Sequence, residues 1–186
     1  MLLQNFASYL RERADDLTLH IVNRSDLGSE ESGVALPVPE ARIGSAELVE
    51  GDKLCAIPVG APGGSGFTHF LDGIQRTHLP CYWSVAPALY GYTAAVVRAR
   101  GSDRKMTKWR TYDNESIYYP FVYRDPADLG NRGIAVTNTY EDGETIDEHP
   151  AAMLDKARKA ISRSLAHLER KLAREWLEAH RSQTDS

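Results

Sequence analysis

The stretch from residue 151 to residue 180 constrains the fold most, because its apolar residues recur at the spacing of one helical face. A helix advances about 100° per residue. On that wheel eight apolar side chains fall on one side: Leu154, Ala157, Ile161, Leu165, Leu168, Leu172, Trp176 and Ala179. His149-Pro150 precedes the stretch, and proline suits a first helical turn. We therefore predict a long helix over residues 151–180, packed on a sheet through this apolar face.

Several upstream segments have strand character. Residues 67–71 are mainly apolar and end at Asp72, residues 89–99 are rich in Tyr, Thr and Val, and residues 117–123 are aromatic and β-branched. Residues 134–140 add a predicted edge strand, and apolar residues at near-helical spacing predict a helix over residues 2–17. Three antiparallel strands followed by a helix form the opening layout of an RNase H-like fold.

We therefore predict an α/β protein with an RNase H-like mixed sheet, an N-terminal helix and a long C-terminal helix. Residues 1–60 are predicted to form a preface of helix and loops, and residues 61–186 the RNase H-like core. The 186 residues suit one domain. The chain lacks the roughly 20 consecutive apolar residues of a membrane span and the pattern of a signal peptide. We expect a cytoplasmic protein without a membrane partner.

Asp72 is the first candidate metal ligand. It ends an apolar strand, where an ionised carboxylate is costly without a partner. The usual partner of an oxygen ligand is a hard divalent cation such as Mg²⁺ or Mn²⁺. Asp72-Gly73 is also ordinary turn chemistry, so the same pair suits a simple strand-to-turn boundary.

A second candidate carboxylate lies on the predicted helix. Glu175 falls inside the apolar face and Glu169 lies at its border. A carboxylate in a core-facing stripe is unusual, and a metal ion would explain it. The alternative is that Glu175 pairs with Lys171 or Arg174 while its aliphatic stem packs.

A basic cluster suggests where nucleic acid would bind. Between residues 98 and 110 six basic residues stand against one acid, Asp103, although the net charge of the chain is −4. Lysine and arginine clusters attract phosphate backbones. A tryptophan among them could stack on a base. The candidate nucleic-acid ligands are Arg98, Arg100, Arg104, Lys105, Lys108, Trp109 and Arg110. The other interpretation of the cluster is a solvated hairpin.

These residues resemble the NurA-type DNA-end-processing nucleases. The family has an RNase H-like core whose first motif is an aspartate-glycine pair at the end of a strand, similar to Phe70-Leu71-Asp72-Gly73 here. Residues 89–98 are similar to the family's second strand, and residues 151–180 to the helix that supplies its glutamate. The resemblance implies that Asp72 and Glu175, with Glu169 as second choice, are catalytic ligands of Mn²⁺ or Mg²⁺. Two metal ions would stabilise the attacking water and the departing oxygen.

The resemblance also implies DNA as substrate, a homodimer, and a HerA-type hexameric ATPase as partner in the resection of double-strand breaks. Family members continue past this helix into a strand with a second Asp-Gly motif and later supply a histidine. This chain ends at Ser186. We therefore expect an incomplete core that is inactive by itself. The alternative function is a non-catalytic nucleic-acid or protein-interaction domain of the same fold.

Overall fold

The computed structural model describes residues 2–22, 67–141 and 143–181. The chain divides into two units, and all described residues belong to the unit formed by Met1–Asn23 and Phe67–Ser186. In chain order this unit contains α1 (Leu2–Glu12), β1 (Leu19–Ile21), β2 (His69–Trp83), β3 (Ala86–Arg100), β4 (Met106–Tyr119), the 3-10 helix η1 (Phe121–Tyr123), α2 (Pro126–Gly130), β5 (Val136–Asn138) and α3 (Pro150–His180).

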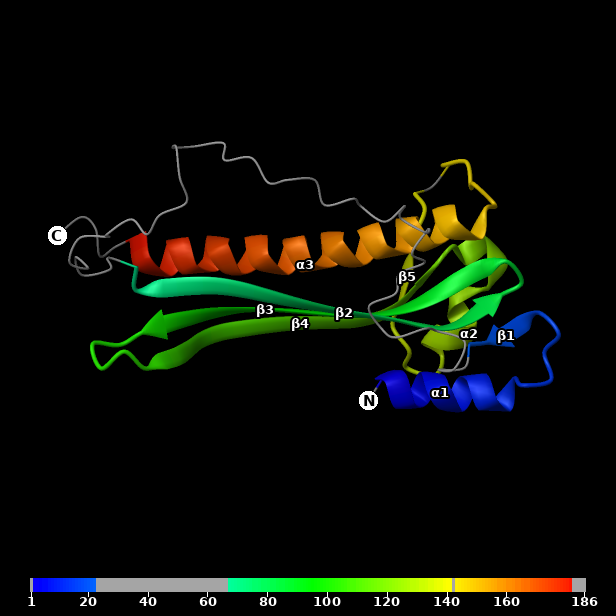
Figure 1. The fold of residues 1–186 in the computed structure, drawn as a ribbon, viewed down its shortest axis with the longest axis horizontal. Coiled ribbons are helices and arrows are strands. Elements are labelled where there is room, and N and C mark those ends of the chain that lie inside the picture. The colour runs from blue at the N-terminus through cyan, green and yellow to red at the C-terminus, as the bar shows by residue number, and fades with distance from the viewer. Residues whose placement is uncertain (1, 23–66, 142, 182–186) are drawn as a thin grey trace, which may run out of the picture. The chain divides into compact units, whose positions relative to one another are not determined.

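The strands form one mixed sheet in the order β1-β2-β3-β4-β5 (Figure 1). The pairs β1–β2, β2–β3 and β3–β4 are antiparallel, and the pair β4–β5 is parallel. The prediction of an α/β fold with three antiparallel strands ahead of a long helix is confirmed. β1 pairs only with the end of β2, from Cys81 to Trp83.

α3 covers one face of this sheet along the length of β2, β3 and β4 (Figure 1). Its apolar stripe packs as predicted: Ile161 joins Leu89 in one buried cluster, and Leu172 joins Ala95 and Val97 in another. The helix begins where the sequence indicates, because the His149 side chain accepts a hydrogen bond from the Ala151 amide and Pro150 takes the first turn.

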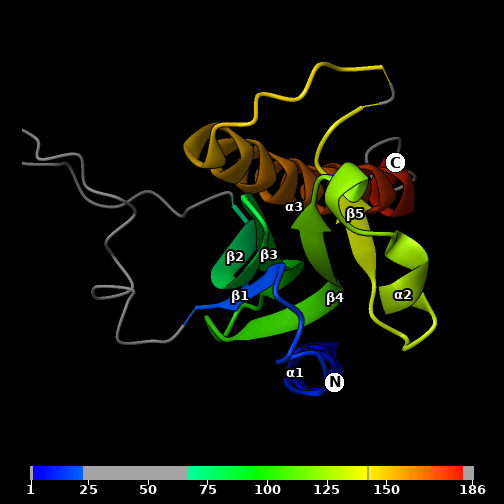
Figure 2. The same ribbon diagram turned by 90° about the vertical axis from the view of Figure 1, so that its right-hand side faces the viewer.

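α1 lies on the opposite face of the sheet from α3 (Figure 2). Phe6 and Tyr9 of α1 are buried with Trp83 and Tyr119 of the sheet. Residues 2–22 of the predicted preface therefore share a hydrophobic core with the sheet, while residues 23–60 lie outside the described residues.

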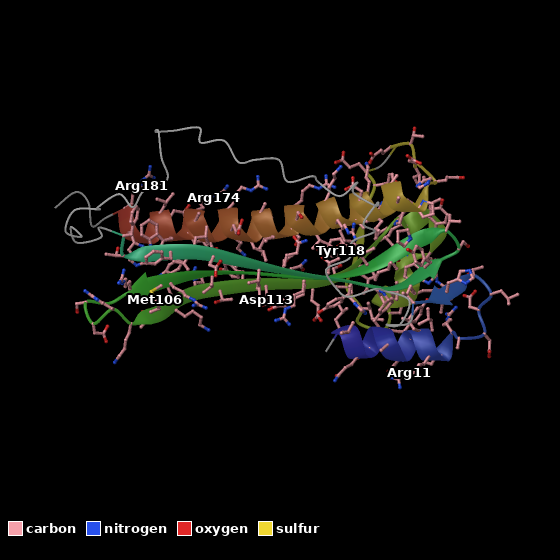
Figure 3. The ribbon with its side chains drawn as sticks, in the orientation of Figure 1. Arg11, Met106, Asp113, Tyr118, Arg174 and Arg181 are labelled. Carbon is pink, nitrogen blue, oxygen red and sulfur yellow. The ribbon has the colours of Figure 1, made fainter. Side chains whose placement is uncertain are left out.

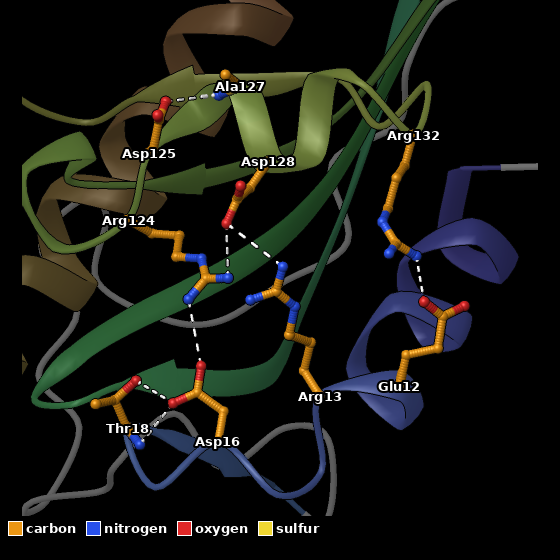
Figure 4. Close-up of polar contacts among 9 residues, drawn as sticks. All are labelled: Glu12, Arg13, Asp16, Thr18, Arg124, Asp125, Ala127, Asp128 and Arg132. Carbon is orange, nitrogen blue, oxygen red and sulfur yellow. Dashed lines mark hydrogen bonds and ion pairs between the residues drawn. The ribbon is translucent and has the colours of Figure 1, made fainter.

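The N-terminal helix is shorter than the predicted range of residues 2–17. The Asp16 carboxylate accepts hydrogen bonds from the amide and the hydroxyl of Thr18, which fixes a turn ahead of β1. Asp16 also pairs with Arg124, which bridges to Asp128 in α2 at 2.7 Å (Figure 4). These contacts hold the α1–β1 turn against the segment that follows β4.

The prediction that the first strand ends at Asp72 and breaks at Gly73 is wrong. β2 continues for ten residues beyond Gly73, to Trp83. α3 approaches the strand closely at this glycine. A Cβ atom built at Gly73 would overlap Glu169 Oε1 and would lie 3.0 Å from Leu165 Cδ1. The glycine therefore marks helix-to-strand packing and not a turn.

Candidate metal site and nucleic-acid interface

Asp72 lies on the face of the sheet that is turned away from α3. Its neighbour Gly73 contacts Glu169 of the helix, and Gln75 accepts a hydrogen bond from Ser162 of the helix at 3.1 Å. Because side chains alternate along a strand, Asp72 points to the other side. Its side chain is exposed. Asp72 is therefore not a buried charge that needs a metal ion to compensate it, contrary to the expectation from an apolar strand.

Glu175 lies on the helix side and already has strong partners. Arg110 of β4 donates a hydrogen bond to Glu175 Oε2 at 2.6 Å, and the Tyr112 hydroxyl donates to the same oxygen at 2.9 Å. The Arg110 hydrogen bond is the main reason why the pKa of Glu175 lies below its ordinary value, and partial burial opposes it. Glu175 thus forms an ion pair, as the alternative interpretation of the sequence expected, but its partner is Arg110 and not Lys171 or Arg174. A metal ion at Glu175 would have to displace this arginine.

Glu169 is the helix carboxylate that lies beside the Asp72-Gly73 pair. Its carboxyl carbon would be 3.2 Å from a Cβ atom at Gly73. No ion pair to Glu169 is present within the described part of the chain. Both helix carboxylates, Glu169 and Glu175, lie on the α3 side of the sheet and Asp72 lies on the other; Glu169 differs in that it contacts Gly73, the chain neighbour of Asp72.

The Glu169–Gly73 contact lies next to an open edge of the sheet. β1 pairs with residues 81–83 of β2, and Val22 donates its amide to the Pro80 carbonyl. Among the described segments, none pairs with the outer edge of residues 69–79. Asp72 and Glu169 therefore approach this edge from opposite faces at adjacent strand positions.

These two carboxylates do not by themselves complete a two-metal centre. Within residues 2–22, 67–141 and 143–181, no group of three or more His, Cys, Asp or Glu side chains is placed to hold a metal ion. Two-metal hydrolysis requires several converging ligands. We therefore derive no catalytic step through a metal ion from the described residues.

The basic cluster divides into two groups. Arg98, Arg100, Arg104, Lys105 and Lys108 are exposed on and beside the β3–β4 turn. Arg98 lies directly across from Lys108 in the antiparallel pair. Like charges at such a position are unfavourable, and an anionic ligand would relieve this repulsion.

Trp109 and Arg110 belong to the helix-packed side instead. Trp109 is half-buried against the cluster that contains Leu172, and the Arg110 guanidinium lies 4.7 Å from the centre of its ring. This position covers part of the ring, so Trp109 is a poorer platform for a base than the sequence suggested. Arg110 is already paired with Glu175.

From the sequence, Glu169 ranks second to Glu175, whereas the structure places Glu169 against Gly73, the neighbour of Asp72. The helical wheel placed Glu175 more centrally in the apolar stripe, but it did not show that Arg110 and Tyr112 of β4 face it. The available signal was Gly73, since a glycine inside a strand indicates that another element approaches closely.

Among the described residues, no helix is long and apolar enough to cross a membrane. Comparisons of the chain with protein-family models, curated proteins and solved structures gave no match.

Proposed function

We propose that this chain is the RNase H-like core of a metal-dependent DNA nuclease, as the NurA-type resemblance implies, with Asp72 and Glu169 as two of its metal ligands. The observation that carries this proposal is the Glu169 carboxylate against Gly73, next to Asp72 at a strand edge that no described segment pairs with. Carboxylate oxygens are the ligands that Mg²⁺ and Mn²⁺ prefer. Glu169 replaces Glu175 in the assignment, because Glu175 is neutralised by Arg110.

The remaining parts of the proposal come from the same resemblance. They are phosphodiester hydrolysis during end resection of DNA double-strand breaks, a homodimer, a HerA-type hexameric ATPase as partner, and a cytoplasmic location. Because two carboxylates are too few for two-metal hydrolysis, the proposed activity requires further ligands beyond the described residues.

Binding of Mn²⁺ tests the assignment directly. Free Mn²⁺ is measured by electron paramagnetic resonance in titrations of the wild type and of Asp72→Asn, Glu169→Gln and Glu175→Gln. The first two variants should bind Mn²⁺ about tenfold more weakly, a loss of about 1.4 kcal/mol. Glu175→Gln is the matched control and should bind as the wild type does. Wild-type affinity in both Asp72→Asn and Glu169→Gln would remove these residues from the site.

A non-catalytic nucleic-acid-binding domain is the second candidate function. It is favoured by the exposed basic side chains at the β3–β4 turn, which need no metal ion to contact phosphates. The two functions differ in one measurement. If Asp72→Asn changes neither the affinity for DNA nor the affinity for Mn²⁺, the non-catalytic domain is favoured.

A further inference from the structure

The charges of α3 are divided between its two sides. Glu169 and Glu175 are turned towards the sheet, where they meet Gly73 and Arg110. The opposite side carries basic residues, which we call the α3 ridge: Lys159, Arg163, His167, Arg170 and Arg174. This division leaves the outward side of the helix positively charged, although the chain as a whole carries a net charge of −4.

The α3 ridge is narrow and straight. At about 100° per residue its five positions fall within a sector of about 80°, and at about 1.5 Å per residue they extend over about 22 Å. All five side chains are exposed. Asp155 and Glu178 border the ridge near its two ends, and Asp155 pairs with Lys159 at 2.6 Å.

The three arginines of the ridge have no carboxylate partner within the described part of the chain. Arg170 donates its Nε to the Ala166 carbonyl of its own helix, which leaves its terminal nitrogens available. Figure 3 shows Arg174 pointing away from the sheet. Exposed basic side chains on a surface helix normally alternate with acidic ones, so three unpaired arginines in one row indicate an anionic ligand.

We propose that the α3 ridge binds the phosphodiester backbone of DNA, which rests on the proposed function for the identity of the polymer. Each strand of a duplex presents a phosphate about every 3.4 Å along its axis. A ridge of about 22 Å is therefore long enough to contact several phosphates of one backbone. The planar guanidinium also matches the geometry of phosphate oxygens with paired hydrogen bonds.

The position of the ridge fits a long, uniformly charged polymer. α3 ends beside the start of β2, where the rings of His180 and His69 are 5.1 Å apart. The β3–β4 turn lies at the same end of the unit (Figure 1). A DNA backbone along the ridge thus runs towards the exposed cations of that turn. The ridge itself has no large apolar side chain between Lys159 and Arg174 for insertion into a lipid surface.

Charge reversal of the ridge tests this inference. Binding of a fluorescently labelled DNA duplex is followed by anisotropy between about 50 and 200 mM NaCl for Arg163→Glu/Arg170→Glu/Arg174→Glu. We expect affinity to fall more than about tenfold and the slope of log affinity against log salt to fall by about 3, because three phosphate contacts are lost. The triple arginine-to-lysine variant keeps the charge and should retain most of the affinity and the slope. Circular dichroism checks that both variants are folded.

Two controls separate this surface from the rest of the molecule. Arg158→Glu alters an exposed arginine on another side of α3 and should change the affinity less than about twofold. Unchanged affinity in the triple glutamate variant would overturn the ridge. If the triple glutamate variant kept its affinity while Arg104→Glu/Lys105→Glu bound the DNA duplex more weakly, the ridge would be overturned and the proposed function would still stand.

The chemical class of the partner is tested with other polyanions. Poly-glutamate and phosphatidylserine vesicles are titrated at the same salt concentrations. Binding of either as tightly as the DNA duplex would overturn the commitment to nucleic acid. Weaker binding of both supports it. The Mn²⁺ titration is independent of these results, so failure of the metal site and failure of the ridge are distinguishable.

Discussion

A methyl group added at Gly91 tests how closely α3 packs on the sheet. Gly91 lies in β3, beneath the helix. A Cβ atom there would lie 2.8 Å from Ile161 Cγ1 and 2.8 Å from Tyr118 Cε2. Non-bonded carbon atoms prefer separations of about 3.5–4.0 Å. Ile161 and Tyr118 are both buried, with 0% and 1% of their surface exposed. The substitution therefore forces the packing around Gly91 to open.

The expected cost follows from two opposing effects. Overpacking a buried site costs about 1–3 kcal/mol. Replacing glycine by alanine also restricts the unfolded chain, which stabilises the folded state by about 0.4–1 kcal/mol. Ile161 is β-branched and its χ1 angle is stiff in a helix, so the side chain cannot rotate out of the way. We expect Gly91→Ala to lower the free energy of unfolding by about 1–2 kcal/mol.

Urea denaturation followed by far-UV circular dichroism measures this loss. Gly73→Ala is the matched control, because its added Cβ atom meets only the outer atoms of Glu169 and Leu165. These flexible side chains can move, so we expect a change within about 0.5 kcal/mol. A Gly91→Ala variant as stable as the wild type would refute the packing argument. So would equal losses in the two variants.

Leu172→Ala should lower the free energy of unfolding by about 2–5 kcal/mol in the same assay, because Leu172 is fully buried against the sheet. Leu177 is 59% exposed, so Leu177→Ala should cost almost nothing. Equal losses in the two variants would contradict the placement of α3. Glu175→Gln should be less stable than the wild type at pH 7. Because folding lowers the pKa of Glu175, this difference in stability should disappear as the pH falls through the lowered pKa. Thermal melts of both proteins at several pH values measure the difference. A difference that grows in acid would contradict the Arg110 ion pair. Residues 1–186 alone should bind DNA weakly and show little metal-dependent cleavage in a gel assay, and robust cleavage would contradict the incomplete metal site.

Local sequence patterns predicted α3 well. The spacing of its apolar residues and the proline at its first turn can both be read from residues within the helix itself. The end of β2 was not predictable in the same way. Asp72-Gly73 has the chemistry of a turn, but the pair lies inside β2, where Glu169 and Leu165 of α3 pack against the strand. This packing depends on residues far along the chain.

The surroundings of the two helix carboxylates could not be predicted from the sequence, for the same physical reason. A helical wheel shows which residues share a side of the helix, but it does not show what they face. Glu175 meets Arg110, which is 65 residues away in the sequence. Once this ion pair is known, Glu175 on the apolar face has a partner without a metal ion, and the border residue Glu169 is the one that lies against Gly73.

The sheet side and the outward side of α3 therefore have separate chemistry. On the sheet side Arg110 pairs with Glu175. Among the described residues Glu169 has no ion-pair partner, and no described strand pairs with the edge beside it. On the outward side the arginines of the α3 ridge stand without carboxylates to neutralise them in that same part of the chain. An acid among those arginines would weaken their attraction for phosphate, and an arginine beside Glu169 would neutralise it as Arg110 neutralises Glu175. The helix can serve both proposed roles because Glu169 and Glu175 are turned towards the sheet, whereas the arginines of the α3 ridge are exposed on the other side.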